Sequence, residues 1–381
     1  MLSLLTRHIC GRLNPRFAIT SMGEAARCND RKLSSSSRVN PRFVNTYSSC
    51  SDRKLSSSSA SSEMSVAFVG LGNMGLRMAL NLAKPSADVN PIRLTVYDLN
   101  ETNVSSFFRH FETTDGICDS TTASKDLASL ADTNPNFVIM SLPNGKASET
   151  VVDLILKGLP TFDPSFDGCT FIDTSTIAPN TAKKLNHLVT SVSPNNHFVD
   201  APVSGGVKGA TEGSLTFMVG CSSPETYSCV QPLLLRMGKK IVHCGGNGSG
   251  SAVKLCNNAA LAAQMVGICE AMNLGEALGV DPTVLASVMN SSTAKCWSGE
   301  VNNPHPDVAR HVGSGASAND YEGGFASDLM LKDLNLAVDA GEEENLALPV
   351  AGLTRDLYRL ASMHGYGQKD FGAMIHFLRG S

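Results

Sequence analysis

The chain of 381 residues is long enough for two domains, and 42% of its residues are hydrophobic against 17% that are charged. This balance excludes a wholly disordered protein, and a formal net charge of -4 gives no reason to expect a nucleic acid or a membrane surface as a partner. We find no run of 18 consecutive apolar residues and predict no membrane-spanning helix. The 11 cysteines form no C-x-x-C pair, so we predict no metal site and expect reduced thiols.

Residues 1–63 differ in composition from the rest of the chain. They are rich in arginine and serine and contain only four acidic residues, which are Glu24, Asp30, Asp52 and Glu63. This composition is typical of an organelle transit peptide. We predict a cleavable segment that directs the chain to the mitochondrial matrix, with a plastid address or a merely disordered tail as alternatives.

The folding signals begin at Met64 with a strand, a glycine turn and a helix. The β-forming run 65–69 leads into a G-x-G-x-x-G turn, and the helix formers of 76–83 follow. A pyrophosphate approaches the backbone closely in such a turn, where free N–H groups and the helix dipole hold its charge. We therefore predict a dinucleotide site at Gly70, Leu71, Gly72, Asn73, Met74 and Gly75.

The end of the second strand, 92–97, predicts which dinucleotide binds. Asp98 follows this strand directly. A carboxylate at this position accepts hydrogen bonds from the adenosine ribose hydroxyls and repels the 2′-phosphate of NADP. No arginine follows at Leu99 or Asn100, so we predict NAD as the cofactor.

Two further apolar runs, 136–143 and 170–176, continue the pattern of a parallel sheet. Ligands bind beyond the carboxyl ends of such strands. We therefore expect Leu142, Pro143 and 174–176 on the nicotinamide side of the site, with ordinary turn chemistry as the alternative for each.

A glycine-bearing segment offers groups that suit a carboxylate. Ser204, Gly205 and Gly206 supply a hydroxyl and backbone N–H groups, although a plain glycine-rich loop has the same composition.

A long apolar helix is predicted over 251–278, and Lys254 and Asn258 lie four residues apart on one of its faces. Burial lowers the pKa of an ammonium group, which suits Lys254 to acid/base chemistry. The alternative is a lysine that reaches solvent from the start of the helix. Lys332 and Asp333 form a polar pair in another predicted helix, 325–341, where an ordinary solvated face is the simpler interpretation.

Four segments together resemble the β-hydroxyacid dehydrogenase family. They are the turn 69–75, Asp200-Ala-Pro-Val-Ser-Gly-Gly206, Gly250 followed by Lys254 and Asn258, and Lys332-Asp-Leu334. The resemblance extends over about residues 64–380. Three further segments are similar to the members that oxidise 3-hydroxyisobutyrate: Cys296-Trp-Ser298, Asn303-Pro-His-Pro306 and Lys369-Asp-Phe371.

The resemblance implies roles for the matching positions. Lys254 would be the catalytic acid/base, and Asn258 would orient this lysine and the substrate. The implied substrate contacts are Ser204, Gly205, Gly206 and Lys332, and the implied further cofactor contacts are Leu142, Pro143, Ala147, Thr176 and Lys332. Members of the family often have asparagine where this chain has Ala147, so that cofactor contact departs from the pattern.

We therefore expect an α/β fold, with an N-terminal Rossmann-type dinucleotide-binding domain over 64–248 and an all-α C-terminal domain over 249–381, joined by the long helix. The resemblance implies NAD-dependent oxidation of 3-hydroxyisobutyrate to methylmalonate semialdehyde, a step of valine catabolism. Other short 3-hydroxy acids stay open as substrates. Because apolar helices flank the long one, we expect a homodimer or homotetramer. The alternatives are a glyoxylate or succinic semialdehyde reductase that prefers NADPH, and an NAD-binding protein without activity.

Overall fold

The computed structural model describes residues 63–85, 91–112, 120–160 and 166–380. The predicted targeting segment therefore lies outside the described residues, apart from its last residue, Glu63.

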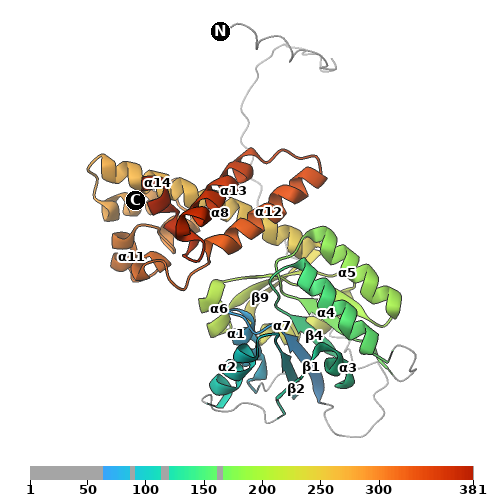
Figure 1. The fold of residues 1–381 in the computed structure, drawn as a ribbon. Coiled ribbons are helices and arrows are strands. Elements are labelled where there is room, and N and C mark those ends of the chain that lie inside the picture. Colours follow the sequence, from blue (N-terminus) through green and yellow to red (C-terminus); the bar gives the residue numbers. More distant parts are fainter. Residues whose placement is uncertain (1–62, 86–90, 113–119, 161–165, 381) are drawn as a thin grey trace, which may run out of the picture. The chain divides into compact units, whose positions relative to one another are not determined.

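A nine-stranded sheet forms the first part of the described chain (Figure 1). Its strands run in the order β3-β2-β1-β4-β5-β6-β8-β7, and β9 pairs with β8. The pairings from β3 to β6 are parallel, whereas β8 runs antiparallel to β6 and β7. The strands are β1 (Met64–Val69), β2 (Ile92–Tyr97), β3 (Thr122–Ala123), β4 (Phe137–Met140), β5 (Thr170–Asp173), β6 (His197–Asp200), β7 (Val203–Ser204), β8 (Leu215–Gly220) and β9 (Gly238–Gly245).

Helices cover both faces of this sheet, and each face has its own apolar core. One core contains side chains of α1, α2, α6 and α7, and the other contains side chains of α3, α4 and α5. Both faces of the central strands are buried, which explains their near-continuous apolar sequences. The helices are α1 (Gly75–Ala83), α2 (Glu101–Glu112), α3 (Leu127–Asp132), α4 (Gly145–Gly158), α5 (Pro179–Val192), α6 (Gly206–Glu212) and α7 (Pro224–Leu235).

After β9 the described elements are helical, and a third apolar core lies among them. The predicted fold class, a Rossmann-type domain followed by a helical one, is confirmed. The helices are α8 (Ser249–Ala277), α9 (Pro282–Ser291), α10 (Trp297–Glu300), α11 (Pro306–Val312), α12 (Ser327–Glu343), α13 (Pro349–Ala361) and α14 (Met374–Arg379), with the short turns η2 (Ala316–Asn319), η3 (Ser362–Tyr366) and η4 (Phe371–Ala373).

The helix bounds differ slightly from the predicted ones. The helix predicted over 325–341 begins at Ser327, because Ala326 forms an isolated bridge with Asp370 and its backbone is extended. Helix α13 begins with Pro349, since a proline at the first helical position loses no hydrogen bond.

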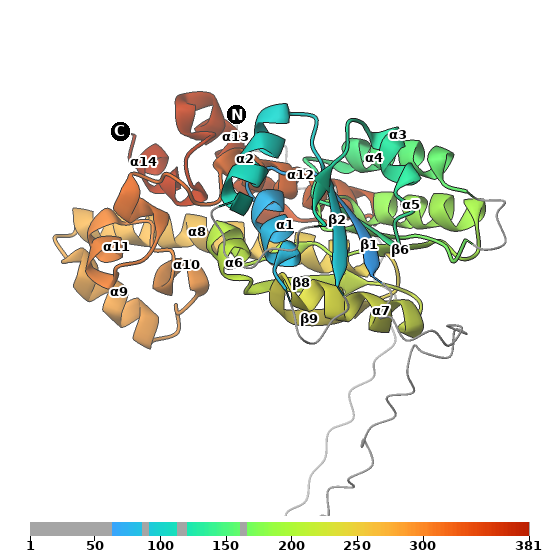
Figure 2. The ribbon, with the colours of Figure 1, turned by 90° about the horizontal axis from the view of Figure 1, so that it is seen from below.

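The long helix α8 joins the sheet to the helical part. It packs against β8 and β9 as well as α12, α13 and α14, and Figure 2 shows it passing from the sheet to α9, α10 and α11. By length and composition α8 is apolar enough to cross a membrane, although the sequence has no 18 consecutive apolar residues. Its contacts on both sides are those of a core helix.

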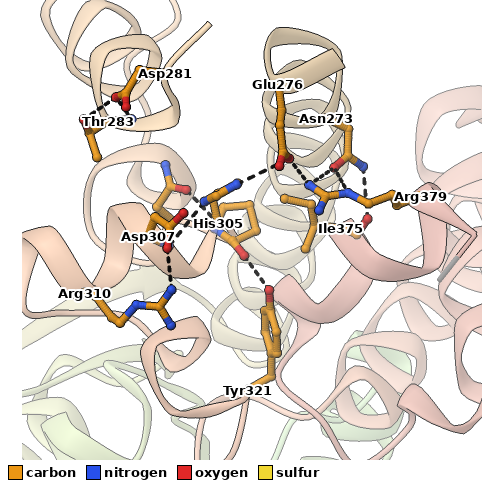
Figure 3. Close-up of polar contacts among 12 residues, drawn as sticks. Asn273, Glu276, Asp281, Thr283, His305, Asp307, Arg310, Tyr321, Ile375 and Arg379 are labelled. Atoms are coloured by element: carbon orange, nitrogen blue, oxygen red, sulfur yellow. Dashed lines mark hydrogen bonds and ion pairs between the residues drawn. The ribbon is translucent and has the colours of Figure 1, made fainter. Parts of the chain in front are cut away.

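The far end of α8 is fastened to the C-terminal helix by polar contacts (Figure 3). Asn273 accepts a hydrogen bond from Nε of Arg379 at 3.0 Å and donates one to the carbonyl of Ile375 at 3.0 Å. Glu276 forms an ion pair with Arg379 and lies 3.5 Å from Nε2 of the buried His305. These contacts hold α14 and the start of α11 against α8.

Candidate active site

In the glycine turn between β1 and α1, two of the three glycines have no space for a side chain, and the third faces open space. Gly70 has φ +96°, and a Cβ atom there would lie 2.3 Å from the carbonyl oxygen of Ser141. A Cβ atom at Gly75 would lie 1.9 Å from the carbonyl oxygen of Gly70, so both positions require glycine. At Gly72 a Cβ atom would meet nothing within 4 Å. A pyrophosphate therefore has room to approach the backbone there, and the turn fits a dinucleotide.

Asp98 holds this turn from the end of β2. Its Oδ2 accepts a hydrogen bond from the backbone N–H of Leu71 at 2.6 Å, and its Oδ1 accepts one from Asn100 at 2.7 Å. Each carboxylate oxygen has a further lone pair for a ligand hydroxyl. Leu99 beside it is 88% exposed and carries no charge. The geometry is compatible with the predicted ribose contact.

The ends of β4 and β5 meet at the predicted nicotinamide side. The backbone N–H of Leu142 donates to Oγ of Ser175 at 2.8 Å, which joins the two loops. Pro143 is exposed beside it. Ala147 lies in the first turn of α4, where its N–H donates to Oδ1 of Asn144 at 3.0 Å. The N–H of Ala147 is thus engaged in capping the helix.

The Ser204–Gly206 loop lies between β7 and α6. Gly205 has φ +134° and Gly206 has φ +62°, a pair of conformations that strongly favours glycine. Both glycines are exposed, and a Cβ atom at Gly206 would meet nothing within 4 Å. The loop therefore leaves room for a small ligand beside its backbone.

Asp200 fastens the segment that carries this loop to the start of α8. Its buried carboxylate accepts hydrogen bonds from the N–H groups of Gly248 at 2.7 Å and Ser251 at 2.8 Å. Two glycines leave room for this packing. A Cβ atom at Gly220 would lie 2.4 Å from Oδ1 of Asp200, and one at Gly250 would lie 2.2 Å from the carbonyl oxygen of Met218. Asp200 and these glycines were absent from the predicted site residues, although Asp200 and Gly250 belong to the motifs quoted above.

Lys254 lies one turn further along α8 and is 9% exposed. Burial lowers the pKa of its ammonium group, the carboxylate of Asp333 opposes this shift, and the charge of Lys332 adds to it. The alternative of a lysine that reaches solvent is wrong, because the side chain is buried. A lysine with a lowered pKa can exchange a proton with a substrate near neutral pH.

Asn258 and Asp333 connect α8 to α12. Nδ2 of Asn258 donates to Oδ2 of Asp333 at 2.6 Å. Nζ of Lys332 lies 3.2 Å from Oδ1 of Asp333 and donates to the carbonyl of Thr176 at 3.0 Å. The structure thus brings Lys254, Asn258, Lys332 and Thr176 to one place where three segments converge.

Asp333 was missed as a site residue, and the solvated-face interpretation of the pair fails for it because it is only 3% exposed. A signal was present in the sequence. Asp333 shares the helical spacing of Met330, Leu334 and Ala337, all of which are buried on one face of α12.

A second buried carboxylate, Asp173, lies beneath the same edge of the sheet. It is fully buried and is the register partner of Asp200 on the neighbouring parallel strand. Its Oδ1 accepts the N–H of Ser175 at 2.9 Å, whereas its Oδ2 has no hydrogen-bond partner among the described residues. Burial raises the pKa of Asp173 to about 6. No pattern in the sequence distinguished this residue from the other strand-end polar groups.

Among the residues that the structure describes, no group of three or more His, Cys, Asp or Glu side chains is placed so that it could hold a metal ion.

Comparison with known proteins identifies the family. Residues 65–246 match the profile of the NAD binding domain of 6-phosphogluconate dehydrogenase, and residues 248–378 match that described as NAD-binding of NADP-dependent 3-hydroxyisobutyrate dehydrogenase. The mitochondrial 3-hydroxyisobutyrate dehydrogenase of Drosophila melanogaster is 39% identical over 320 residues, which cover 83% of this chain and 89% of the relative. The chain belongs to the 3-hydroxyisobutyrate dehydrogenase family.

Two further relatives of the enzyme agree with this membership. The human mitochondrial 3-hydroxyisobutyrate dehydrogenase is 39% identical over 324 residues, which cover 84% of this chain and 88% of the relative. The structure of the Mycobacterium tuberculosis 3-hydroxyisobutyrate dehydrogenase with L-serine has a TM-score of 0.71 at 34% identity and covers 84% of this chain and all of that one. The enzyme is an oxidoreductase with a nicotinamide-dinucleotide domain, as predicted, and the curated relatives bear out the predicted organelle.

Proposed function

We propose that the enzyme oxidises 3-hydroxyisobutyrate to methylmalonate semialdehyde with NAD+, a step of valine catabolism. The observation that carries this proposal is the burial of Lys254 beside Asn258 and Asp333, within a family whose members act on 3-hydroxyisobutyrate. A buried amine with a lowered pKa suits removal of a hydroxyl proton. The substrate class, a small hydroxy acid, agrees with the exposed loop at Ser204, Gly205 and Gly206.

Each residue has a distinct task in the proposed reaction. A bound NAD+ supplies the hydride acceptor. Nζ of neutral Lys254 takes the proton of the 3-hydroxyl group as the carbonyl forms, and in the reverse direction the ammonium donates it back and stabilises the developing alkoxide. Asn258 orients Lys254 and the hydroxyl, and the loop Ser204–Gly206 binds the carboxylate through its hydroxyl and backbone N–H groups. Lys332, held by Asp333 and the carbonyl of Thr176, would contact both the substrate and the dinucleotide.

The dinucleotide contacts are proposed from the turn Gly70–Gly75, from Asp98, and from the loops at Leu142, Pro143, Ala147 and Thr176. Asp98 supports NAD over NADP, because a carboxylate repels the 2′-phosphate and neither Leu99 nor Asn100 offers a positive charge. The competing function is an NADPH-preferring reductase of glyoxylate or succinic semialdehyde. An NAD-binding protein without activity is the other alternative, and Lys254 in its buried setting opposes it.

A substrate panel decides among these functions. Purified protein without residues 1–63 is assayed for oxidation of 3-hydroxyisobutyrate, 3-hydroxypropionate and serine, and for reduction of glyoxylate and succinic semialdehyde, with each reaction run with the NAD and NADP forms of the cofactor. We expect the largest kcat/KM for 3-hydroxyisobutyrate with NAD+. A larger value for glyoxylate with NADPH would replace this function by the reductase, and no turnover of any substrate would leave the inactive binding protein.

The role of Lys254 is tested by Lys254→Ala. Proton transfer by a positioned group is worth about 10²–10⁴ in rate, so we expect turnover to fall by that factor while NAD+ still binds. Titration of NAD+ by calorimetry serves as the control for folding. Turnover equal to that of the wild type would refute the assignment of Lys254.

We also propose boundaries and roles for three parts of the chain. Residues 1–63 would be the cleavable matrix-targeting segment, 64–248 the dinucleotide domain, and 249–381 the helical domain. A reporter fused to residues 1–63 should enter mitochondria; retention in the cytosol would contradict this role.

The helical part supports a homodimer or homotetramer. Apolar side chains are exposed along α9 and α13, among them Val284, Val288, Val350 and Leu353. Burying such surface against a second copy stabilises the assembly. Light scattering after size-exclusion chromatography measures the mass, and a monomer at micromolar concentration would contradict the proposal.

A further inference from the structure

Arg77 on α1 contacts two segments that bind different ligands in the proposed function. Its Nη1 donates to the carbonyl oxygen of Asn73 at 2.6 Å, and Asn73 belongs to the dinucleotide turn. Its Nε donates to Oγ1 of Thr211 on α6 at 3.1 Å. Helix α6 begins at Gly206, the last residue of the proposed carboxylate-binding loop. One guanidinium group therefore joins the turn to the helix that continues from this loop.

A second contact also joins α1 to α6. Nδ2 of Asn81 on α1 donates to the carbonyl oxygen of Ala210 at 2.6 Å, and this bond is buried. Figure 2 shows the two helices side by side, and their residues are in contact. Because α6 is short and anchored to α1 at two points, we expect a shift of the turn to displace the loop at the start of α6.

The positive charge of Arg77 can interact with a diphosphate bound in the turn. Among the described residues its hydrogen bonds go to neutral acceptors, and it forms no ion pair with a carboxylate. A guanidinium binds through a rigid planar fork, so its two contacts are geometrically linked. A diphosphate in the turn attracts this positive charge and favours the position in which Arg77 makes both contacts.

We propose that Arg77 is a positioning residue that couples occupation of the dinucleotide turn to binding of the substrate carboxylate at Ser204–Gly206. The proposal rests on the proposed function of both segments. The diphosphate favours the arrangement in which Arg77 holds Asn73 and Thr211 at once, and this arrangement favours the carboxylate-binding form of the loop. Thermodynamic linkage requires that the substrate tightens dinucleotide binding by the same factor.

The test uses ADP-ribose, which has the diphosphate of NAD but lacks the nicotinamide ring. It therefore cannot touch the substrate through that ring, and a contact between nicotinamide and substrate makes no contribution to its effect on substrate affinity. The dissociation constant of 3-hydroxyisobutyrate is measured by calorimetry on the full chain, with and without saturating ADP-ribose. For the wild type we expect about fivefold tighter binding with ADP-ribose, at the lower end of usual couplings.

Four variants separate coupling from simple loss of affinity. Arg77→Ala and Thr211→Val should each reduce the coupling factor to about one. Arg77→Lys keeps the charge but not the fork, so it should retain ADP-ribose affinity within about twofold while losing the coupling. Arg93→Ala is the matched control, since Arg93 on β2 is also an arginine bonded to a backbone carbonyl, that of Thr133, away from α6. This control should keep the wild-type factor.

The outcomes distinguish a failure of the coupling from a failure of the proposed dinucleotide site. The proposal is overturned if the wild type shows no coupling, or if the Arg77→Ala variant keeps it. Either result is compatible with normal turnover and cofactor binding, so the proposed function would stand. If neither ADP-ribose nor NAD+ binds the wild type, the dinucleotide site fails, and the coupling fails with it.

Discussion

Asn258 on α8 donates a hydrogen bond to Oδ2 of Asp333 on α12, with 2.6 Å between the nitrogen and the oxygen. The two residues are 75 positions apart in the chain. Both are buried, and the negative charge of Asp333 raises the pKa of Lys254 against the effect of burial. The proton affinity of the proposed catalytic lysine therefore depends on a contact between two helices.

Asp333→Asn is expected to lower the pKa of Lys254, because it removes the charge that stabilises the ammonium form. The neutral amine is the reactive form in the oxidation, so the rise of kcat/KM with pH should begin at lower pH. The hydrogen bond from Asn258 would then go to a neutral amide oxygen instead of a carboxylate, and this weaker bond should also reduce kcat roughly tenfold. The measurement is the pH profile of kcat/KM. Asp339→Asn, at an exposed position on the same helix, should leave the profile unchanged.

Lys332→Met should move this profile in the opposite direction, because the charge of Lys332 lowers the pKa of Lys254. A shift of both variants to the same side would contradict the electrostatic account.

Asp98→Asn is expected to weaken the preference for NAD+ over NADP+. The amide oxygen can still accept the N–H of Leu71, so the turn should persist, but the charge that repels a 2′-phosphate is lost. We expect the ratio of kcat/KM values for the two cofactors to fall about tenfold, mainly through improved use of NADP+. An unchanged ratio would show that another group sets the preference.

Gly250→Ala should destabilise the protein and reduce its activity. The new Cβ atom would lie 2.2 Å from the carbonyl oxygen of Met218 and 2.8 Å from that of Asp200, and neither backbone group moves easily. Overpacking of this kind costs about 1–3 kcal/mol. Gly267→Ala on the same helix is the matched control, since its Cβ atom would meet nothing within 4 Å. Helix propensity alone predicts that this control stabilises by up to about 1 kcal/mol. Urea denaturation measures both, and equal effects would refute the steric argument.

Asp173→Asn should change how stability depends on pH. The folded pKa of Asp173 is about 6, above its ordinary value of 3.8, so the folded state holds the proton more tightly. The contribution of Asp173 to the free energy of unfolding is therefore fully present below its ordinary pKa of 3.8, and it is lost as the pH rises to about 6. The asparagine variant lacks this loss, and its advantage over the wild type should grow by roughly 1–3 kcal/mol between pH 4 and pH 7. A difference that stays constant with pH would mean that Asp173 does not titrate in this range.

Much of the fold could be predicted because it depends on local patterns. The apolar strand before Gly70, the acid at the end of β2 and the alternation of strands and helices are short-range signals of a parallel sheet. The spacing of Lys254 and Asn258 likewise places both on one face of a helix, whatever lies opposite. The helix bounds were less accurate, since the start of α12 depends on the bridge between Ala326 and Asp370.

By itself the sequence determined the dinucleotide turn and the residue types available for acid/base chemistry, because both arise within a few neighbouring positions. Only the tertiary structure decided the electrostatic environment of those groups. The pKa of Lys254 follows from the burial that α8 and its neighbours create and from charges on α12, and the anchoring of α8 follows from Asp200 at the end of a distant strand. Burial and charge act through space, and distance in space is set by the fold.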